Sequence, residues 1–262
     1  MSPIVTVLTD FGTADSYVAE MKAAVLRCAP AATLVDVTHE VAPGDVAGAA
    51  YLLARTAGAF PEGTTHLAVV DPGVGTERRA LAAEAGGQRF VAPDNGVLSR
   101  VLERGRSRVV ALRVPDDASP TFHGRDVFAP AAGRLAAGAD LAALGPEIDD
   151  PVRLPLHRLE RRGASLVGEV VHVDRFGTLV TNLPAERVAA GAAVRIGAYD
   201  LVLRSTFADV PTGDLVAFVG SGGTVEVAVR DGRADAVLGA SRGAEVWATV
   251  RSGTEARAEE LP

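Results

Sequence analysis

Cysteine is almost missing from this chain of 262 residues, since Cys28 is the only one. No disulfide can form within the chain, and a reducing compartment suits such a protein. The lone cysteine and the lack of any His-x-x-x-His pair also exclude the usual spacings of zinc ligands. We therefore expect a protein of the cytoplasm without a bound metal.

Positive charge and long apolar runs are scarce as well. The 26 Lys and Arg residues face 33 Asp and Glu residues, for a formal net charge of −7 at pH 7, which argues against nucleic acid as a partner. No run approaches the roughly 18 apolar residues of a membrane-spanning helix. The first residues lack the basic region and apolar core of a signal peptide. We expect a soluble protein that binds neither nucleic acid nor a membrane.

Common nucleotide-binding and nucleophile motifs are also absent. The sequence has no Gly-x-x-x-x-Gly-Lys-Ser/Thr loop and no Gly-x-Ser-x-Gly elbow. Gly73-x-Gly75 lacks the third glycine of a dinucleotide-binding loop. Any activity therefore rests on other side chains.

The pattern of apolar residues predicts two kinds of domain. Expected strands at 4–9, 33–37 and 67–70 alternate with expected helices at 16–27 and 45–59, which is typical of a mainly parallel sheet with helices on its faces. Asp45 is a good N-cap for the second of these helices. After a stretch rich in proline and charge, short β-like runs separated by glycine and aspartate turns indicate a smaller antiparallel β-barrel. We predict an α/β domain over 1–150, a linker over 151–164 and a barrel domain over 165–262.

Carboxylates follow two of the expected strands. The stretch LAVVDPGVGTERR, residues 67–79, changes from a buried strand to a turn at Asp71, and Arg78 comes seven residues later. Asp10 follows the first strand in the same way. Ligands of open α/β sheets bind at the carboxyl ends of the strands, so we expect Asp10 and Asp71 on one rim. From residues 67–79 alone there is an alternative, in which Asp71 only starts the turn and Arg78 is solvated.

Other polar loop residues are candidates for the same rim. His123 is followed by Gly124, which would let a ligand come close, and Asn95 lies in a second polar loop. His39 follows the second strand and could approach the rim or be structural. His66 precedes a strand, and we expect it at the surface.

Six segments carry a resemblance to one family. They are TDFG at 9–12 followed by Asp15, VDPGVGT at 70–76 with Arg78, APDNG at 92–96, TFHGRD at 121–126, DRFG at 174–177 with TN at 181–182, and 220–229. These motifs resemble those of the S-adenosylmethionine (SAM) hydroxide adenosyltransferases, also called SAM hydrolases, which are relatives of the fluorinase and chlorinase enzymes. The resemblance spans nearly the whole chain. This chain has Gly44 where the family often has an aromatic residue.

The resemblance implies a role for each matching residue. It implies that Asp71, Arg78 and His123 handle the attacking water and that Asp10, with Asp15 beside it, grips the ribose hydroxyls. It also implies that Asp174 and Ser221 hold the methionine end of SAM, and that Thr178 stands where the family has asparagine. We add Asn95 and Gly124 as substrate-binding candidates. The implied assembly is a homotrimer with SAM between neighbouring subunits, and the implied partners are SAM, adenosine and L-methionine.

These residue types suit hydrolysis of a sulfonium compound. The leaving group is neutral methionine, so an enzyme has only to align water with the C5′–S bond and accept its proton. Asp71 and His123 are both able to take that proton, and SAM is then the substrate, with no cofactor. As the resemblance has it, fluorinase carries tyrosine at the position of Asp71, so we predict hydrolysis rather than halide transfer. The alternatives are a chlorinase-like halide adenosyltransferase, a metal-assisted hydrolase using Asp10, His39, Asp71 and His123, and a non-catalytic SAM-binding module.

Overall fold

The computed structural model describes residues 2–155 and 157–251. The chain divides into two units, Met1–Leu154 and Pro155–Pro262. Residues 252–262, the end of the predicted barrel domain, lie outside the described residues.

A mixed sheet forms the centre of the first unit. Among the described residues its strand order is β2-β1-β3-β5-β4-β6-β7. The strands are β1 (Ile4–Thr9), β2 (Thr33–Thr38), β3 (Thr65–Val69), β4 (Ala80–Ala85), β5 (Gln88–Pro93), β6 (Ser107–Ala111) and β7 (Glu147–Ile148). Strands β2, β1, β3 and β5 run parallel, whereas β4, β6 and β7 join antiparallel at one side. The predicted helix-flanked, mainly parallel sheet is confirmed.

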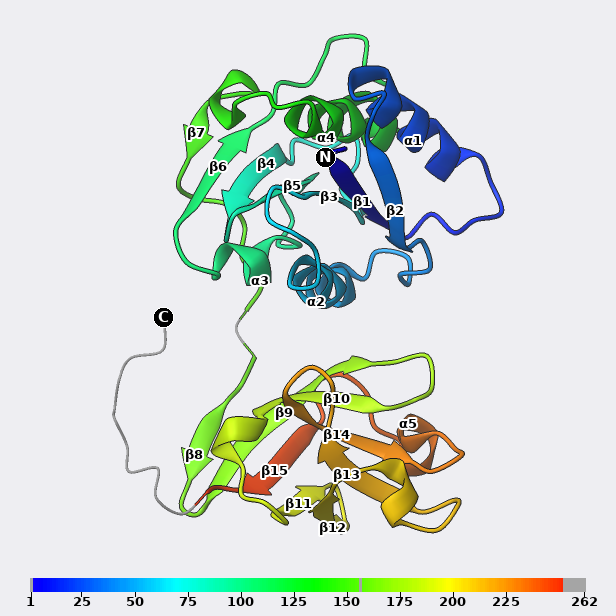
Figure 1. Ribbon diagram of the computed structural model, residues 1–262, viewed down its shortest axis with the longest axis vertical. Coiled ribbons are helices and arrows are strands. Elements are labelled where there is room, and N and C mark those ends of the chain that lie inside the picture. The colour runs from blue at the N-terminus through cyan, green and yellow to red at the C-terminus, as the bar shows by residue number, and fades with distance from the viewer. Residues whose placement is uncertain (1, 156, 252–262) are drawn as a thin grey trace. The chain divides into compact units, whose positions relative to one another are not determined.

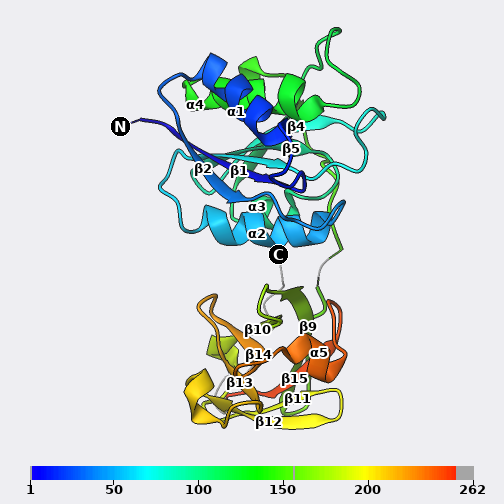
Figure 2. The same ribbon diagram turned by 90° about the vertical axis from the view of Figure 1, so that its right-hand side faces the viewer.

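Helices cover both faces of this sheet (Figures 1 and 2). One face carries α1 (Tyr17–Cys28) and α4 (Ala129–Ala136), and the other carries α2 (Val46–Ala57) and α3 (Ser99–Leu102). Strand β1 contributes to the hydrophobic cores on both faces of the sheet. Val5 and Val7 pack on the α1–α4 side, and Leu8 packs on the α2 side. The side chain of Asp45 caps α2 by accepting a bond from the Gly48 amide at 3.0 Å, as its position in the sequence predicted.

The register of β1 and β3 positions the predicted site. Thr9 pairs with Val69 at the carboxyl ends of these parallel strands. Strand β3 is buried along its whole length, and β1 is buried from its second residue on. Asp10 and Asp71 therefore leave the sheet at the same edge, as predicted.

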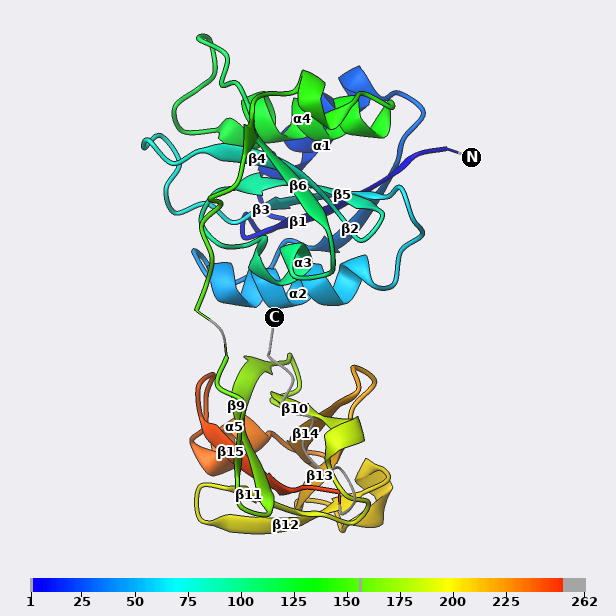
Figure 3. The same ribbon diagram turned by 90° about the vertical axis from the view of Figure 1, so that its left-hand side faces the viewer.

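The second unit is a closed barrel, which Figure 3 shows from the left-hand side of Figure 1. Its strands are β8 (Glu160–Arg162), β9 (Ser165–Val173), β10 (Leu179–Pro184), β11 (Ala193–Ile196), β12 (Tyr199–Arg204), β13 (Leu215–Val219), β14 (Thr224–Val229) and β15 (Glu245–Thr249), with a short helix α5 (Ala234–Leu238). The circuit β9-β10-β14-β13-β12-β11-β15 closes through pairing of β15 with β9, and β8 extends it. Its pairs are antiparallel apart from β12–β13, so the predicted barrel class is confirmed.

The region predicted as a linker, 151–164, is partly built into the two units. Asp94 accepts a bond from the Val152 amide at 2.7 Å, and the Ser99 hydroxyl accepts one from the Leu154 amide at 2.8 Å. Strand β8 pairs with β9 in the second unit. Val152 and Leu154 therefore belong to the first unit, and 160–162 belongs to the second.

The prediction that His66 lies at the surface is wrong, because His66 is 0% exposed inside β3. Its Nδ1 lies 2.7 Å from the Thr6 hydroxyl and its Nε2 lies 2.6 Å from Oε1 of Gln88. The ring stacks on Phe90 at 5.1 Å between centroids. Burial lowers the pKa of His66 from 6.5 to about 4, so the buried ring is neutral near pH 7.

The depressed pKa of His66 makes stability depend on pH. Below pH 6.5 His66 takes up a proton in the unfolded chain but stays neutral in the folded chain. The contribution of His66 to the free energy of unfolding is therefore fully present above pH 6.5 and is lost as the pH falls toward 4. From pH 7 to pH 5 we expect a loss of about 2 kcal/mol from this group. Urea unfolding of the parent and of His66→Gln at both pH values measures it. An equal pH dependence in the two proteins would refute this origin.

Candidate active site

Asp71 and Arg78 form a buried ion pair at the rim. The turn after β3 is closed by amide-to-carbonyl bonds from Val74 to Asp71 and from Thr76 to Gly73, both 3.2 Å long, and it returns the chain so that Arg78 meets Asp71. Nε of Arg78 donates to Oδ1 at 2.9 Å and to Oδ2 at 3.1 Å, and Nη2 donates to Oδ2 at 2.5 Å. The two side chains are 9% and 5% exposed. Such a two-point contact fixes both partners.

His123 joins this pair through the same guanidinium. It immediately precedes a single π-helical turn, η1 (Gly124–Phe128), which leads into α4. Its Nδ1 lies 2.9 Å from Nη2 of Arg78. Arginine only donates, so Nδ1 accepts and the neutral ring carries its proton on Nε2. Burial and the Arg78 charge lower the pKa of His123, against a smaller opposing effect of Asp71.

One donor of Arg78 is left over. Its Nη1 is buried without a hydrogen-bond partner, although the other guanidinium nitrogens are engaged. The guanidinium carbon lies 5.1 Å from the centroid of the Phe128 ring. A buried N–H without a partner is costly, and it is a ready donor to a small oxygen ligand.

Asp10 lies on the same rim and is held by one backbone bond. The Gly44 amide donates to Oδ2 of Asp10 at 2.8 Å. Gly44 has a φ of +73°, a conformation that L side chains rarely adopt. This backbone geometry suits glycine at position 44.

The other first-unit candidates have different surroundings. Asp15 is exposed just before α1. The Asn95 side chain is used within the fold, because its Nδ2 donates to the Val70 carbonyl at 2.9 Å and its Oδ1 accepts from the Val97 amide at 3.2 Å. A Cβ at Gly124 would meet Met21, Phe122 and Phe11 at 3.0–3.4 Å. Glycine at 124 therefore permits close internal packing, and a ligand contact there stays a prediction.

Asp174 and Thr178 line a cavity of about 910 Å³ in the second unit. Oδ1 of Asp174 accepts bonds from the amides of Phe176 at 2.9 Å and Thr178 at 2.8 Å, which shapes the turn between β9 and β10. Glu226 and Phe207 contribute to the wall of the cavity. Ser221 lies between β13 and β14 and is not one of the lining residues.

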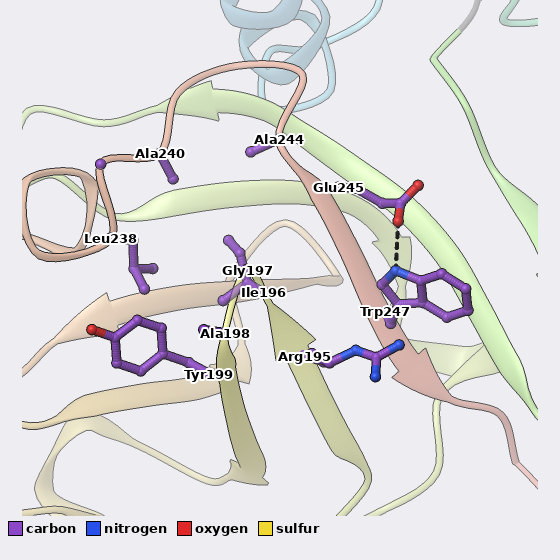
Figure 4. A pocket seen from close by; sticks show the side chains of 11 residues that line it. Arg195, Ile196, Gly197, Ala198, Tyr199, Leu238, Ala240, Ala244, Glu245 and Trp247 are labelled. Atoms are coloured by element: carbon purple, nitrogen blue, oxygen red, sulfur yellow. Dashed lines mark hydrogen bonds between the residues drawn. The ribbon is translucent and has the colours of Figure 1, made fainter.

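A second cavity in the barrel, about 490 Å³, holds none of the predicted site residues (Figure 4). The β11–β12 turn and the segment after α5 line it, together with Trp247, whose Nε1 donates to Oε1 of Glu245 at 2.7 Å. The Arg195 guanidinium stacks on the Trp247 ring, with 5.0 Å from its carbon to the ring centroid.

The residues of the metal-assisted alternative do not converge. Nδ1 of His39 lies 2.8 Å from the Thr9 hydroxyl, and its Nε2 faces Asp36 at 3.1 Å. Nδ1 of His123 is occupied by Arg78. Within 2–155 and 157–251 no group of three or more His, Cys, Asp or Glu side chains is arranged to hold a metal ion.

Two contributors to this site were not among the predicted site residues. Phe128 lies beneath Arg78, and Asp126 supports the segment before His123 by accepting a bond from the Ser119 amide at 3.0 Å. Asp126 stood within the TFHGRD segment, which was the available signal for it. Phe128 looked like any apolar helix residue.

Comparison with known proteins places both units in one family. Residues 5–145 match the SAM hydroxide adenosyltransferase N-terminal domain, and residues 168–247 match the SAM hydroxide adenosyltransferase C-terminal domain. No helix within the described part of the chain is long and apolar enough to cross a membrane.

Individual relatives agree with this match. A Salinispora arenicola protein named (R)-S-adenosyl-L-methionine hydrolase is 41% identical over 95% of this chain and 98% of its own. A Thermus thermophilus protein of the same name is 43% identical over 91% and 96%, and a fluorinase of Actinoplanes sp. is 30% identical over 87% and 91%. The crystal structure of an uncharacterized conserved protein from Thermotoga maritima superposes with a TM-score of 0.85 at 36% identity, covering 94% of this chain and 99% of that one.

The contact between Arg78 and His123 predicts a protonation state that can be measured. At pH 7 we expect His123 to be neutral with its proton on Nε2, and to titrate below pH 6.5. Replacing Arg78 by Gln removes the charge that lowers the pKa, so the pKa of His123 should rise. Imidazole nitrogen shifts from NMR measure both quantities. A proton on Nδ1 at pH 7 would contradict the geometry.

Proposed function

Because the chain belongs to the SAM hydroxide adenosyltransferase family, we propose that it hydrolyses SAM to adenosine and L-methionine by attack of water on C5′. The hydrolase relatives carry the (R) form of the substrate in their names, and we extend that form to this protein. The observation that carries the proposal is the buried Asp71–Arg78–His123 cluster with its unused Nη1 donor.

The cluster suits a small oxygen nucleophile. Water accepts a bond from Nη1 of Arg78 and is turned so that a lone pair faces C5′, about 3 Å away in a productive complex. As the O–C5′ bond forms, the C5′–S bond breaks and its electron pair stays on sulfur. The sulfonium thereby becomes the neutral thioether of methionine. The Asp71–Arg78 pair carries no net charge, so the positively charged sulfonium of SAM is not repelled by an unpaired arginine.

Asp71 is the proposed proton acceptor. In the neutral His123 ring Nδ1 accepts from Arg78 and Nε2 bears hydrogen, so neither nitrogen is free to take a proton. Oδ1 of Asp71 accepts the Arg78 Nε bond and, with a second lone pair, keeps acceptor capacity. His123 then fixes the guanidinium through Nδ1.

The substrate contacts follow from position and residue chemistry. A carboxylate accepts from both hydroxyls of a ribose diol, and we assign this role to Asp10, with Asp15 beside it. Asp174, Thr178 and Ser221 are proposed to contact the substrate from the barrel. We propose that Asn95 and Gly124 line the substrate site with their backbone. The Asn95 side chain is bonded within the fold, and protein side chains fill the space beside Gly124.

Hydrolysis is favoured over halide transfer by charge. A halide ion beside the Asp71 carboxylate is repelled, whereas water is able to donate to it. The hydrolase relatives are 41% and 43% identical to this chain, and the fluorinase of Actinoplanes sp. is 30% identical.

The finer features of the assignment are proposals as well. We propose the homotrimer with SAM at subunit interfaces that the resemblance to this family implies. Tyr17, Phe176 and Phe207 are 49%, 74% and 44% exposed, and aromatic residues are typical of interfaces. We propose that SAM reacts without a cofactor, since a sulfonium needs no Lewis acid. A cytoplasmic location suits a chain with one cysteine.

The triad assignment predicts a loss of rate without a loss of binding. Asp71→Asn should lower kcat for SAM about 100-fold or more, because the proton acceptor is gone, and His123→Ala should lower it at least tenfold. The affinity for SAM should change little in both. Steady-state kinetics with product detection and calorimetry make the comparison.

Asp94→Asn is the matched control. Asp94 is also a buried carboxylate bound to arginine, with Arg79 Nε at 2.7 Å, and it belongs to a different ion pair. Its variant should lose stability but keep kcat within about twofold. Parent-like kcat in Asp71→Asn would refute the assignment.

The choice of hydrolysis predicts a product that is insensitive to halide. With SAM and excess chloride, adenosine and L-methionine should stay the main products, because chloride is repelled where water is accepted. Chromatography with mass detection separates adenosine from 5′-chloro-5′-deoxyadenosine. The chlorinated nucleoside as main product would establish the halide alternative, and tight SAM binding without product would establish the binding-module alternative.

A further inference from the structure

A buried polar chain lies behind the loop that carries Asp10. His39 is 5% exposed, and its Nδ1 lies 2.8 Å from Oγ1 of Thr9, the last residue of β1. Its Nε2 lies 3.1 Å from Oδ1 of Asp36, a close polar contact that is not a well-formed hydrogen bond. Oδ2 of Asp36 accepts a bond from Lys22 Nζ at 2.6 Å. The chain thus runs from the surface of the unit to the residue next to Asp10.

The bonds in this chain have one consistent direction. The Asp36 carboxylate only accepts, so it favours the neutral ring with hydrogen on Nε2. In that ring Nδ1 of His39 accepts from the Thr9 hydroxyl, whose oxygen accepts from the Phe11 amide at 3.3 Å. The Nε2 hydrogen then faces the Asp36 carboxylate, whose charge favours that tautomer. Each group has one defined role, which orders the backbone on both sides of Asp10.

The backbone of His39 strengthens the same connection. The Gly12 amide donates to the His39 carbonyl at 2.8 Å, and the Val41 amide donates to the Thr9 carbonyl at 3.4 Å. The segment that follows His39 then reaches Gly44, whose amide binds Asp10 itself. The loop holding Asp10 and the loop after β2 are therefore joined on both sides of the carboxylate.

His66 shows what the same arrangement does away from the rim. It is also buried, also has Nδ1 against a β1 threonine, Thr6 at 2.7 Å, and also has Nε2 against a side-chain oxygen. Thr6 lies inside β1, paired with His66 itself in β3, three residues before Thr9. His66 supports the core and has no bond to the Asp10 loop, so it is a matched control for His39.

We propose that His39 is a positioning residue that holds Asp10 in the orientation needed to bind the ribose hydroxyls of SAM. The inference rests on the proposed role of Asp10 in the hydrolysis. It assigns His39 to substrate affinity rather than to the bond-breaking step, since its ring nitrogens are bonded to Thr9 and faced by Asp36. If the loop that carries Asp10 is less well ordered, the Asp10 carboxylate moves away from the ribose diol of SAM. Asp71, Arg78 and His123 are not disturbed by this movement.

Two substitutions at His39 separate its two ring contacts. In His39→Gln the amide group reaches the Nε2 position and the bond to Thr9 is lost, so KM for SAM should rise about tenfold with kcat within twofold. In His39→Asn the amide occupies the Nδ1 position and keeps the Thr9 bond, so KM should return to within about threefold of the parent. His66→Gln should lower the melting temperature and leave KM unchanged.

A substrate analogue tests whether the effect passes through the ribose. With SAM lacking the 2′-hydroxyl, the KM ratio between His39→Gln and the parent should shrink to threefold or less, and the same holds for Asp10→Ala. Asp36→Asn serves as a second variant, because the Asp36 side chain is 44% exposed and tolerates substitution; it should raise KM for SAM about threefold.

The outcomes distinguish two failures. If Asp10→Ala weakens SAM and the 2′-deoxy analogue equally, the ribose role in the proposed function is wrong, and the role of His39 is wrong with it. If Asp10→Ala discriminates between the two substrates and His39→Gln does not, only the inference about His39 is refuted. A KM increase in His66→Gln as large as that in His39→Gln would also refute it, since the effect would then be general loss of stability.

Discussion

The site depends on one guanidinium group that binds a carboxylate and an imidazole at once. Arg78 meets Asp71 through two nitrogens and His123 through one of them, with both members of the ion pair nearly withdrawn from solvent. Burying two charges is costly unless geometry and further bonds compensate. The cost is met here by a two-point contact, by the Phe128 ring beneath the guanidinium, and, in the proposed reaction, by a water on Nη1. Arg78 thus fixes the tautomer of His123, and Asp71 is left as the proton acceptor that we propose.

The sheet brings these distant residues together. Strands β1 and β3 are parallel neighbours whose last residues pair, so Asp10 and Asp71 emerge at one edge. The turn after Asp71 brings Arg78 back to Asp71. His123, which comes much later in the chain, is positioned by the π-helical turn that follows it. Buried threonine–histidine pairs then flank β1 on both sides, with His66 in the core and His39 behind the Asp10 loop. The same residue pairing contributes to stability at one site and, in our proposal, to substrate binding at the other.

Much of this could be predicted from local pattern. The alternation of strands and helices, the Asp45 cap of α2 and the shared rim of Asp10 and Asp71 depend on hydrophobic periodicity and on parallel pairing, both visible in the sequence. Strand β12 was not predicted, because its residues are mostly exposed and its pairing partners β11 and β13 set its conformation. The burial of His66 and the position of Phe128 depend on contacts between elements far apart in the chain. The local sequence pattern does not indicate contacts between distant elements. For the same reason it did not predict that Met21, Phe122 and Phe11 pack against Gly124.

The central claim is that Arg78 and Asp71 hold the attacking water behind C5′ of SAM. A crystal structure of the slow Asp71→Asn variant with SAM bound tests it most directly. The account predicts one ordered water within hydrogen-bond distance of Nη1 of Arg78, about 3 Å from C5′ and in line with the C5′–S bond. A complex in which C5′ points away from Arg78, with no water between them, would contradict it.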